Sequence, residues 1–168
     1  MNFNPNNIWK NKQVFITGIC GTVGKQILSI LSKQDSVKII GIDINESELF
    51  FLKDNYRKRN NIELFYCDIK ETKDMARLAK NSDYIIHTAA LKHVNICENS
   101  PLDAIKTNVL GTQAIVDLAN EIDCDRVLFT STDKAVNPTN VMGTSKLLAE
   151  RLMSSTDFRG KKNSPKFI

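Results

Sequence analysis

Few residues in this sequence are suited to binding a metal or to crossing a membrane. There are only two histidines, and the four cysteines lie far apart without a CxxC pair. This argues against a zinc site and favours the reduced thiols of a cytosolic protein. No window approaches the roughly 18 apolar residues that a membrane span needs, and the polar start Met1 to Pro5 lacks the apolar stretch of a signal peptide. We therefore expect a cytoplasmic protein without a metal or a membrane contact.

Charge of one sign is also scarce. The net charge is +4 over 168 residues, and the excess comes mainly from segments 57–59 and 159–166. Such short basic runs are mostly solvated helix ends or loops, so we expect no nucleic-acid partner. With 42% hydrophobic and 25% charged residues, the composition is that of one soluble globular domain.

Apolar runs alternate with amphipathic segments along the whole chain. Apolar strands between helices predict a doubly wound α/β domain with a parallel, Rossmann-like sheet. The expected strands are 13–17, 37–42, 62–67, 84–87 and 126–130, and the expected helices are 22–33, 46–59, 73–81, 101–122 and 142–155.

We assign residues 1–11 to an N-terminal extension and residues 12–168 to the domain. Residues 165–168 read as the opening of a sixth strand. We therefore expect a fragment that is incomplete at the C-terminus, in which the strand 126–130 lacks its outer neighbour and forms an exposed edge.

A glycine-rich turn lies between the first strand and the first helix, with the spacing GxxGxxG. The first glycine permits the tight turn, the second lets a pyrophosphate approach the backbone, and the third lets the helix pack close to the sheet. The anion would lie on the N–H groups at the helix start. The residues that we expect to bind a nucleotide here are Thr17, Gly18, Gly21, Thr22, Val23 and Gly24.

Acidic and small residues end the next three strands. Asp43 lies 19 positions after Gly24, where a carboxylate accepts hydrogen bonds from an adenosine ribose and repels a 2′-phosphate, so NAD is favoured over NADP. Asp68, followed by Ile69, lies where it could reach the adenine. Both aspartates could instead cap the following helices. Ala89 and Ala90 suit a chain that passes under a dinucleotide, although packing alone explains them nearly as well.

A hydroxyl, a carboxylic acid and an amine follow the fifth strand as Thr132, Asp133 and Lys134, and Lys146 lies on the next helix. Together they predict an acid/base cluster. The alternative is a polar loop in which Asp133 caps a helix and Lys134 is solvated.

Longer motifs resemble a known family. The strings AALKHV at 89–94 and STDKAVNP at 131–138 are similar to those of the extended short-chain dehydrogenase/reductases, and within them to the UDP-N-acetylglucosamine 4,6-dehydratases and related polysaccharide-biosynthesis proteins. The resemblance implies a redox-neutral lyase with bound NAD and a nucleotide sugar, in which hydride leaves C4, water is eliminated across C5 and C6, and the hydride returns at C6.

The resemblance also implies a role for each residue of the cluster. Asp133 looks like the general acid, Lys134 like the base at C5, and Thr132 like a partner of the C4 oxygen. Lys146 looks like the lysine that holds the nicotinamide ribose. A lysine base needs a lowered pKa, which burial would favour.

Other positions of the resemblance are supporting residues. Asn108 looks like the asparagine that braces the active site of the family, and Lys92 and His93 are candidates for contacting the substrate. Met142 occupies the position of the tyrosine of the superfamily, as in the methionine-containing subgroup of larger, often membrane-anchored dehydratases. This leaves open what removes the proton of the C4 hydroxyl.

Three functions fit these observations, and the first is the 4,6-dehydratase that the resemblance implies. An epimerase or reductase of the same superfamily is the second candidate, and a non-catalytic NAD-binding fragment is the third. Relatives pack helices like 101–122 and 142–155 into dimers, so a homo-oligomer is possible. Because the segment that would hold the uridine and diphosphate is missing, we expect the 168-residue chain alone to bind NAD weakly and to turn over no UDP-sugar.

Overall fold

The computed structural model describes residues 8–159 and 165–168, except for the side chains of residues 157–159. Residues 1–7 of the expected N-terminal extension and the basic residues at 161 and 162 lie outside the described part. The described remainder of the extension, from Ile8, packs on the domain: the ring of Trp9 meets that of Tyr84 edge-on at 5.5 Å.

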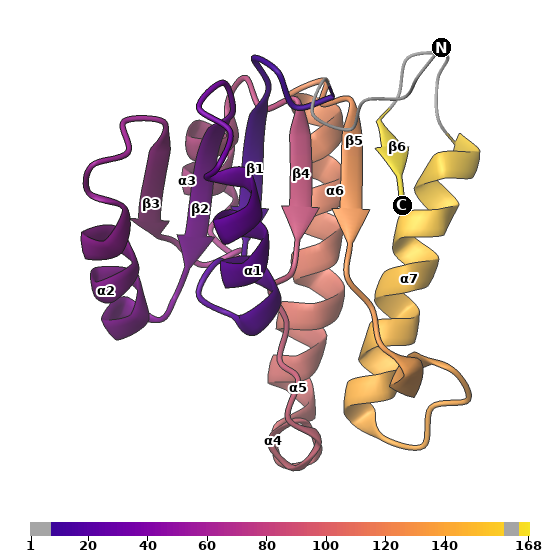
Figure 1. Ribbon diagram of the computed structural model, residues 1–168. Helices are drawn as coiled ribbons and strands as arrows, with labels where there is room; N and C mark the ends of the chain where they lie inside the picture. Colours follow the sequence, from indigo (N-terminus) through magenta and orange to yellow (C-terminus); the bar gives the residue numbers. More distant parts are fainter. Residues whose placement is uncertain (1–7, 160–164) are drawn as a thin grey trace.

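The described residues form a parallel sheet in the order β3-β2-β1-β4-β5-β6. All of its arrows point the same way in Figure 1. The prediction of a doubly wound sheet is confirmed. The strands are β1 (Gln13–Thr17), β2 (Lys38–Asp43), β3 (Ile62–Tyr66), β4 (Tyr84–His87), β5 (Arg126–Phe129) and β6 (Lys166–Phe167).

Helices cover both faces of the sheet. Figure 1 shows α1 and α2 in front of the sheet and α3 and α6 behind it, while α7 packs on α6 and β6. The helical elements are α1 (Thr22–Leu31), α2 (Glu46–Tyr56), α3 (Thr72–Ala79), α4 (Val94–Asn99), α5 (Pro101–Ala104), the π-helix η2 (Ile105–Leu110), α6 (Gly111–Glu121), the 3-10 turn η3 (Asp133–Ala135) and α7 (Val141–Arg159).

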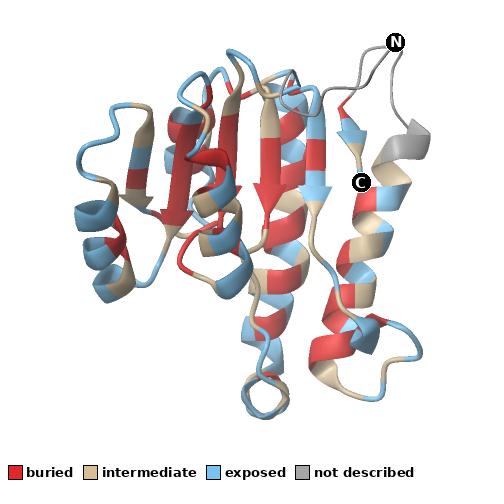
Figure 2. Cartoon of the chain, viewed as in Figure 1, coloured by how far each residue is buried: buried red, intermediate tan, exposed pale blue. Residues whose placement is uncertain are grey.

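Alternate side chains of each strand enter two separate cores. In β1, Val14 and Ile16 join the core under α1 and α2, whereas Phe15 joins the core under α3, α6 and α7. Figure 2 shows the central strands buried between these layers. A strand covered on both faces needs apolar residues at every position, which explains the unbroken apolar run that ends at Thr17.

The sixth strand differs from expectation. Residues Lys166 and Phe167 pair with Arg126 and Val127, and the N–H of Phe129 donates to the carbonyl of Ile168 at 2.8 Å. The prediction that strand 126–130 lacks an outer neighbour is therefore wrong, because these few residues supply β5 with a hydrogen-bonded partner.

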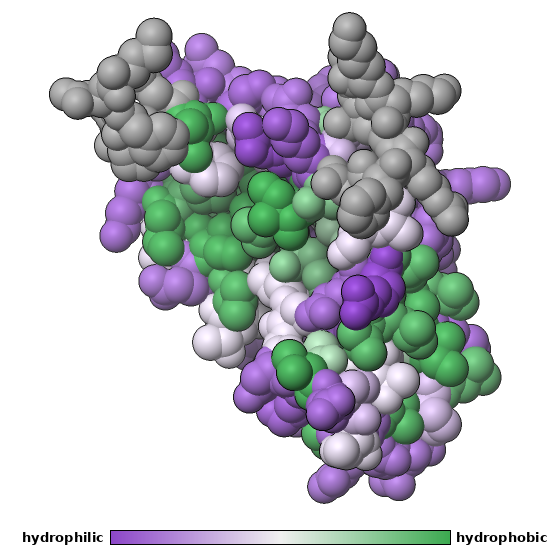
Figure 3. Space-filling model, turned by 90° about the vertical axis from the view of Figure 1, so that its right-hand side faces the viewer, coloured by the Kyte–Doolittle hydropathy of each residue, from purple (hydrophilic) through white to green (hydrophobic). Residues whose placement is uncertain are grey.

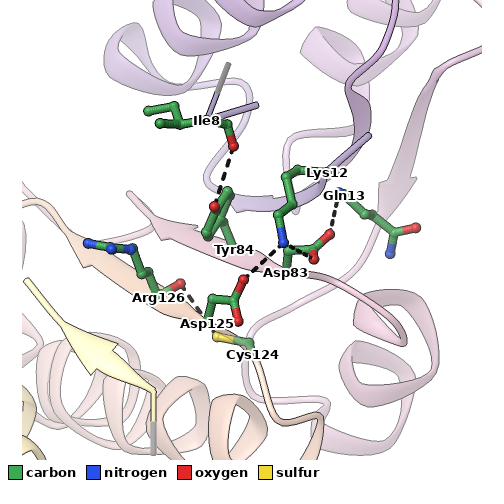
Figure 4. A network of polar contacts seen from close by, with 8 residues as sticks. All are labelled: Ile8, Lys12, Gln13, Asp83, Tyr84, Cys124, Asp125 and Arg126. Atoms are coloured by element: carbon green, nitrogen blue, oxygen red, sulfur yellow. Dashed lines mark hydrogen bonds and ion pairs between the residues drawn. The ribbon is translucent and has the colours of Figure 1, made fainter. Parts of the chain in front are cut away.

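Charged side chains join the N-terminal ends of three strands (Figure 4). The Lys12 ammonium lies 2.7 Å from Asp83 and 3.0 Å from Asp125, and Asp83 also accepts from the N–H of Gln13 at 2.8 Å. These hydrogen bonds raise the pKa of Lys12. The cluster ties the N-terminal ends of β1, β4 and β5 together. The loops at the opposite, carboxyl ends of the strands are therefore the ones left free to form a site.

Candidate active site

The glycine turn after β1 is shaped by close backbone contacts. Gly18 has a φ of 70°, and a Cβ there would lie 2.6 Å from the nitrogen of Ala89. A Cβ on Gly24 would lie 2.8 Å from the Cα of Ile19. At Gly21 a Cβ would meet only the carbonyl oxygen of Gly18, at 3.2 Å. The first and third glycines are thus required by packing, and the second keeps the cleft side of the turn open.

The first helix begins directly at this turn. Its N-cap residue is Gly21, which offers no side chain to cap the first N–H groups of α1. Thr22 and Val23 follow and line a cleft. The start of α1 therefore faces the cleft with its positive dipole end, an arrangement that favours an anion.

Asp43 joins the glycine turn to the end of β2. Its carboxylate accepts from the N–H of Cys20 at 2.9 Å and from that of Asn45 at 3.0 Å. The helix cap expected as an alternative role for Asp43 falls to Asn45, whose side chain accepts from the N–H of Glu48. Asp43 is thus held by backbone groups at the edge of the cleft.

Asp68 follows β3 and also lines the cleft. It accepts from the N–H of Lys70 at 3.0 Å and pairs with the Lys70 ammonium at 3.1 Å. It does not cap α3, whose N-cap residue is Glu71. Ile69 lines the inner wall, where a Cβ on Gly111 would lie 2.5 Å from its Cδ1.

One cleft of about 480 Å³ brings most of the predicted nucleotide residues together. It lies at the carboxyl ends of β1, β2 and β4, where parallel sheets bind ligands. The predicted residues that line it are Gly18, Gly21, Thr22, Val23, Asp43, Asp68, Ile69, Ala89, Ala90 and Lys92.

Four predicted cofactor residues lie outside this lining. Thr17 and Gly24 are buried in the turn, and Asn108 and Lys146 are buried behind it. The hydroxyl of Thr17 is engaged with His87 at 2.6 Å. These residues shape the cleft from beneath.

Asn108 braces the loop after β4. Its Oδ1 accepts from the N–H of Leu91 at 2.8 Å, and its Nδ2 donates to the carbonyl of Leu91 at 3.0 Å and to Ser145 Oγ at 2.9 Å. Ser145 Oγ in turn donates to the carbonyl of Met142 at 2.8 Å. A buried amide thus ties the cleft wall to α7.

The three-residue cluster after β5 lies at the surface, with Asp133 and Lys134 exposed and Thr132 half-buried. Thr132 is the N-cap of η3, and its hydroxyl donates to Asp133 at 3.0 Å. Asp133 lies 4.0 Å from the Lys134 ammonium. The Thr132 hydrogen bond and the nearby Lys134 charge lower the pKa of Asp133. The Lys134 side chain is 52% exposed, so the expected burial of this lysine is absent in the described structure.

Lys146 is the buried cation of this region. Its Nζ donates to the carbonyl of Thr130 at 2.7 Å and lies 3.9 Å from the centre of the Phe129 ring. Burial lowers its pKa to about 8. The lysine therefore lies under the start of the segment that carries Thr132 and Asp133.

Met142 and His93 lie apart from the cleft lining. Met142 is buried with Cys97 and Ala104 in a small apolar cluster, so its sulfur packs against α4 and α5. His93 is exposed and precedes α4 as its N-cap residue without a side-chain hydrogen bond.

Sequence reasoning missed several residues that build the site. Thr88 lines the cleft and donates to the carbonyl of Thr17 at 2.7 Å. Ser145 and Leu91 bind Asn108, and His87 lies between Thr17 and Thr112. The available signal was a polar residue, His87, that ends an otherwise apolar strand.

The described residues show neither a metal site nor a membrane-spanning helix. Among 8–159 and 165–168, no three histidine, cysteine or acidic side chains lie close enough together to hold a metal ion. Across the same ranges, every helix is too short or too polar to cross a membrane.

Comparison with known proteins gives the family of the chain. Residues 14–168 match the family of polysaccharide biosynthesis proteins, and the chain belongs to that family. The resemblance that the AALKHV and STDKAVNP strings indicate is thus confirmed.

The relatives of this chain are named for different activities. The chain is 41% identical to an uncharacterized membrane protein of Methanocaldococcus jannaschii over 94% of this chain and 47% of the relative. It is 37% identical to a UDP-glucose 4-epimerase of Rickettsia akari over 84% of this chain and 42% of that relative. It is 30% identical to an inverting UDP-N-acetylglucosamine 4,6-dehydratase of Campylobacter jejuni over 94% and 47%. The chain thus spans about half the length of these relatives.

A solved structure has the same fold. Pen from Bacillus thuringiensis superposes with a TM-score of 0.91 at 35% identity, over 95% of this chain and 49% of the other.

Proposed function

We propose that the cleft binds NAD. The observation that supports this is the position of Asp43, whose carboxylate is fixed by two backbone N–H groups between the glycine turn and the end of β2. There it would accept from a ribose hydroxyl and repel a 2′-phosphate. The open side of Gly21 and the uncapped start of α1 would receive the pyrophosphate.

We further propose that the protein containing this chain is a nucleotide-sugar 4,6-dehydratase, with UDP-N-acetylglucosamine as the expected substrate. Asp133 and Lys134 carry this proposal, because an elimination needs an acid for the C6 hydroxyl and a base for the C5 proton, whereas a 4-epimerisation needs neither. The two side chains adjoin at 4.0 Å on one short turn and are open to a substrate.

The residues of the chain would divide the work as follows. Bound NAD would supply the reversible hydride transfer. Thr132 would bind the C4 oxygen, and Asp133 would donate a proton to the leaving hydroxyl. Asp133 is ionised in the free chain, because Thr132 and Lys134 lower its pKa, so substrate binding must raise that pKa. Desolvation by a bound sugar acts in this direction.

Lys146 would serve the cofactor side of the reaction. Its ammonium is held between the Thr130 carbonyl and the Phe129 ring, at the base of the Thr132 segment. A buried cation at this place would hold a ribose hydroxyl and favour the alkoxide that forms at C4. Met142, packed against Cys97 and Ala104, supplies no proton.

The test is a product assay with one substrate. This chain, fused to the C-terminal half of the Campylobacter dehydratase and loaded with NAD, is incubated with UDP-N-acetylglucosamine. A 4-keto-6-deoxy sugar is expected, and Lys134→Ala should abolish it while Lys53→Ala, an exposed lysine of α2, should not. The C4 epimer without the keto sugar would instead favour the epimerase, the activity for which the Rickettsia relative is named. An NAD-loaded fusion without either product would favour a non-catalytic NAD-binding domain.

A further inference from the structure

The last residues of three adjacent strands form a row across the sheet. Thr17 and His87 are register partners in β1 and β4, and His87 and Phe129 are partners in β4 and β5. Two positions earlier, Phe15, Ile85 and Val127 point into the core under α6 and α7. Because side chains alternate along a strand, the side chains of Thr17, His87 and Phe129 lie on the same face of the sheet as these core residues. They form the end of this core. A histidine at its centre is fully buried.

The hydrogen bonds around His87 fix which nitrogen carries the proton. Thr112 Oγ1 donates to the carbonyl of Asn108 at 2.7 Å, so toward His87 Nε2, at 3.2 Å, it is an acceptor. A hydroxyl has only one hydrogen to donate. The ring therefore carries its proton on Nε2, and Nδ1 accepts from the Thr17 hydroxyl at 2.6 Å.

The surroundings of His87 favour the neutral ring. Burial and, to a smaller extent, the charge of Lys146 on α7 together lower the pKa of His87 to about 3. The Phe129 ring stacks on the imidazole at 5.6 Å between centroids and also lies 3.9 Å from the Lys146 ammonium. A second cation next to this ring would repel Lys146.

We propose that His87 is a positioning residue of the active site. As the neutral Nε2–H tautomer it links Thr17, directly before the glycine turn, to Thr112 at the start of α6. Thr112 then holds the carbonyl of Asn108 in the π-helix, which orients the amide that binds Leu91 and Ser145. One uncharged ring thus couples the glycine turn after β1 to Asn108, which holds the loop at Leu91 and contacts α7.

The tautomer is tested in the unmodified protein. Long-range proton–nitrogen NMR spectra of its two imidazoles, assigned with His93→Gln, are recorded from pH 5 to pH 8. A protonated Nε2 and an unprotonated Nδ1 are expected for His87 throughout this range. An Nδ1–H tautomer or an imidazolium at pH 7 would overturn the proposal, whatever the variants do.

The coupling is tested with a matched pair at Thr112. Thr112→Val removes the hydroxyl but keeps the shape, and Thr112→Ser keeps the hydroxyl. Exchange of the Asn108 side-chain amide with solvent should be about tenfold faster in the valine variant, as for one lost hydrogen bond, and close to the parent rate in the serine variant. Equal protection in all three proteins would contradict the coupling.

A third readout depends on the proposed function. In the fusion with the Campylobacter half, Thr112→Val should lower kcat about tenfold with little change in KM, because it moves a catalytic wall and not a substrate contact. Thr112→Ser should restore kcat. A lower kcat in the valine variant that serine does not restore would contradict the positioning role, whereas a parent fusion without activity would count against the proposed function and not against the tautomer.

Discussion

The side chain of Asn108 makes two hydrogen bonds to the backbone of Leu91, accepting from its N–H at 2.8 Å and donating to its carbonyl at 3.0 Å. The amide is buried in the π-helical turn η2, and its remaining hydrogen reaches Ser145 on α7. A single side chain therefore binds both the N–H and the carbonyl of Leu91, in the loop that lines the cleft. Asn is the residue suited to this place, because it is both donor and acceptor.

Asn108→Asp should be strongly destabilising. The carboxylate has no hydrogen to donate and would face the Leu91 carbonyl and the Ser145 hydroxyl in a buried place. A loss of about 2–4 kcal/mol in the free energy of unfolding is expected, measured with urea. The control is Asn60→Asp, in the exposed turn before β3, which should change stability by less than about 0.5 kcal/mol. Equal effects of the two changes would show that the Leu91 contacts are unimportant.

Replacement of Asp43 should reduce cofactor discrimination. Asp43→Ala removes the carboxylate that would accept from the ribose 2′-hydroxyl, so the affinity for NAD should fall and the preference over NADP should narrow. Calorimetric titration with both cofactors measures this, with Asp54→Ala on the exposed surface of α2 as the control. If the parent bound NAD and NADP equally well, the assignment of Asp43 would be wrong.

The buried neutral His87 should make the protein sensitive to acid. Its pKa of about 3 in the folded chain lies below the ordinary value of 6.5, so the unfolded chain binds the extra proton first. The contribution of the neutral His87 to the free energy of unfolding is fully present well above pH 6.5 and is lost as the pH drops toward 3. By pH 5 the loss amounts to about 2 kcal/mol. Urea unfolding should show that this loss is smaller in His87→Phe and unchanged in His93→Gln. Parallel pH profiles of the parent and His87→Phe would refute it.

An apolar surface should mediate self-association. Leu102, Ile105 and Leu110 on α5 and η2 are exposed, as is Leu148 on α7, and Figure 3 shows apolar side chains gathered on the side that α7 occupies. These are the helices through which relatives were expected to form dimers. Leu110→Glu should lower the mass found by analytical ultracentrifugation, whereas Phe50→Glu on α2 should leave it unchanged. A parent chain that sediments as a monomer at high concentration would contradict self-association through this surface.

Local patterns predicted the sheet and the glycine turn well. The strands β1 to β5 follow from apolar runs, and the positive φ of Gly18 follows from its place between a strand and a helix. The helix after Pro101 was also expected, but its π-helical turn was not. In that turn Asn108 contacts Leu91 and Ser145, and helical periodicity encodes neither the turn nor these contacts.

The outcomes for single side chains depended on near neighbours in some cases and on partners far along the chain in others. Asp43 and Asp68 could each have been caps, and only the neighbouring Asn45, Lys70 and Glu71 decide their roles. The hydroxyl of Thr17 turns to His87, 70 residues away. Lys134 is solvated because η3 lies at the surface. Such partner choices arise from tertiary packing, which sequence spacing does not specify.

The most direct test is a titration of the isotope-labelled protein with NAD, followed by amide NMR signals. The proposed site predicts saturable shifts of Gly21, Thr22 and Val23, of Asn45 beside Asp43, and of Ala89 and Ala90, with little change at the Lys12 cluster on the opposite edge of the sheet. The expected affinity is weak, so the titration extends to millimolar NAD. Shifts confined to another surface, or none at all, would contradict the assignment of this cleft as the NAD site.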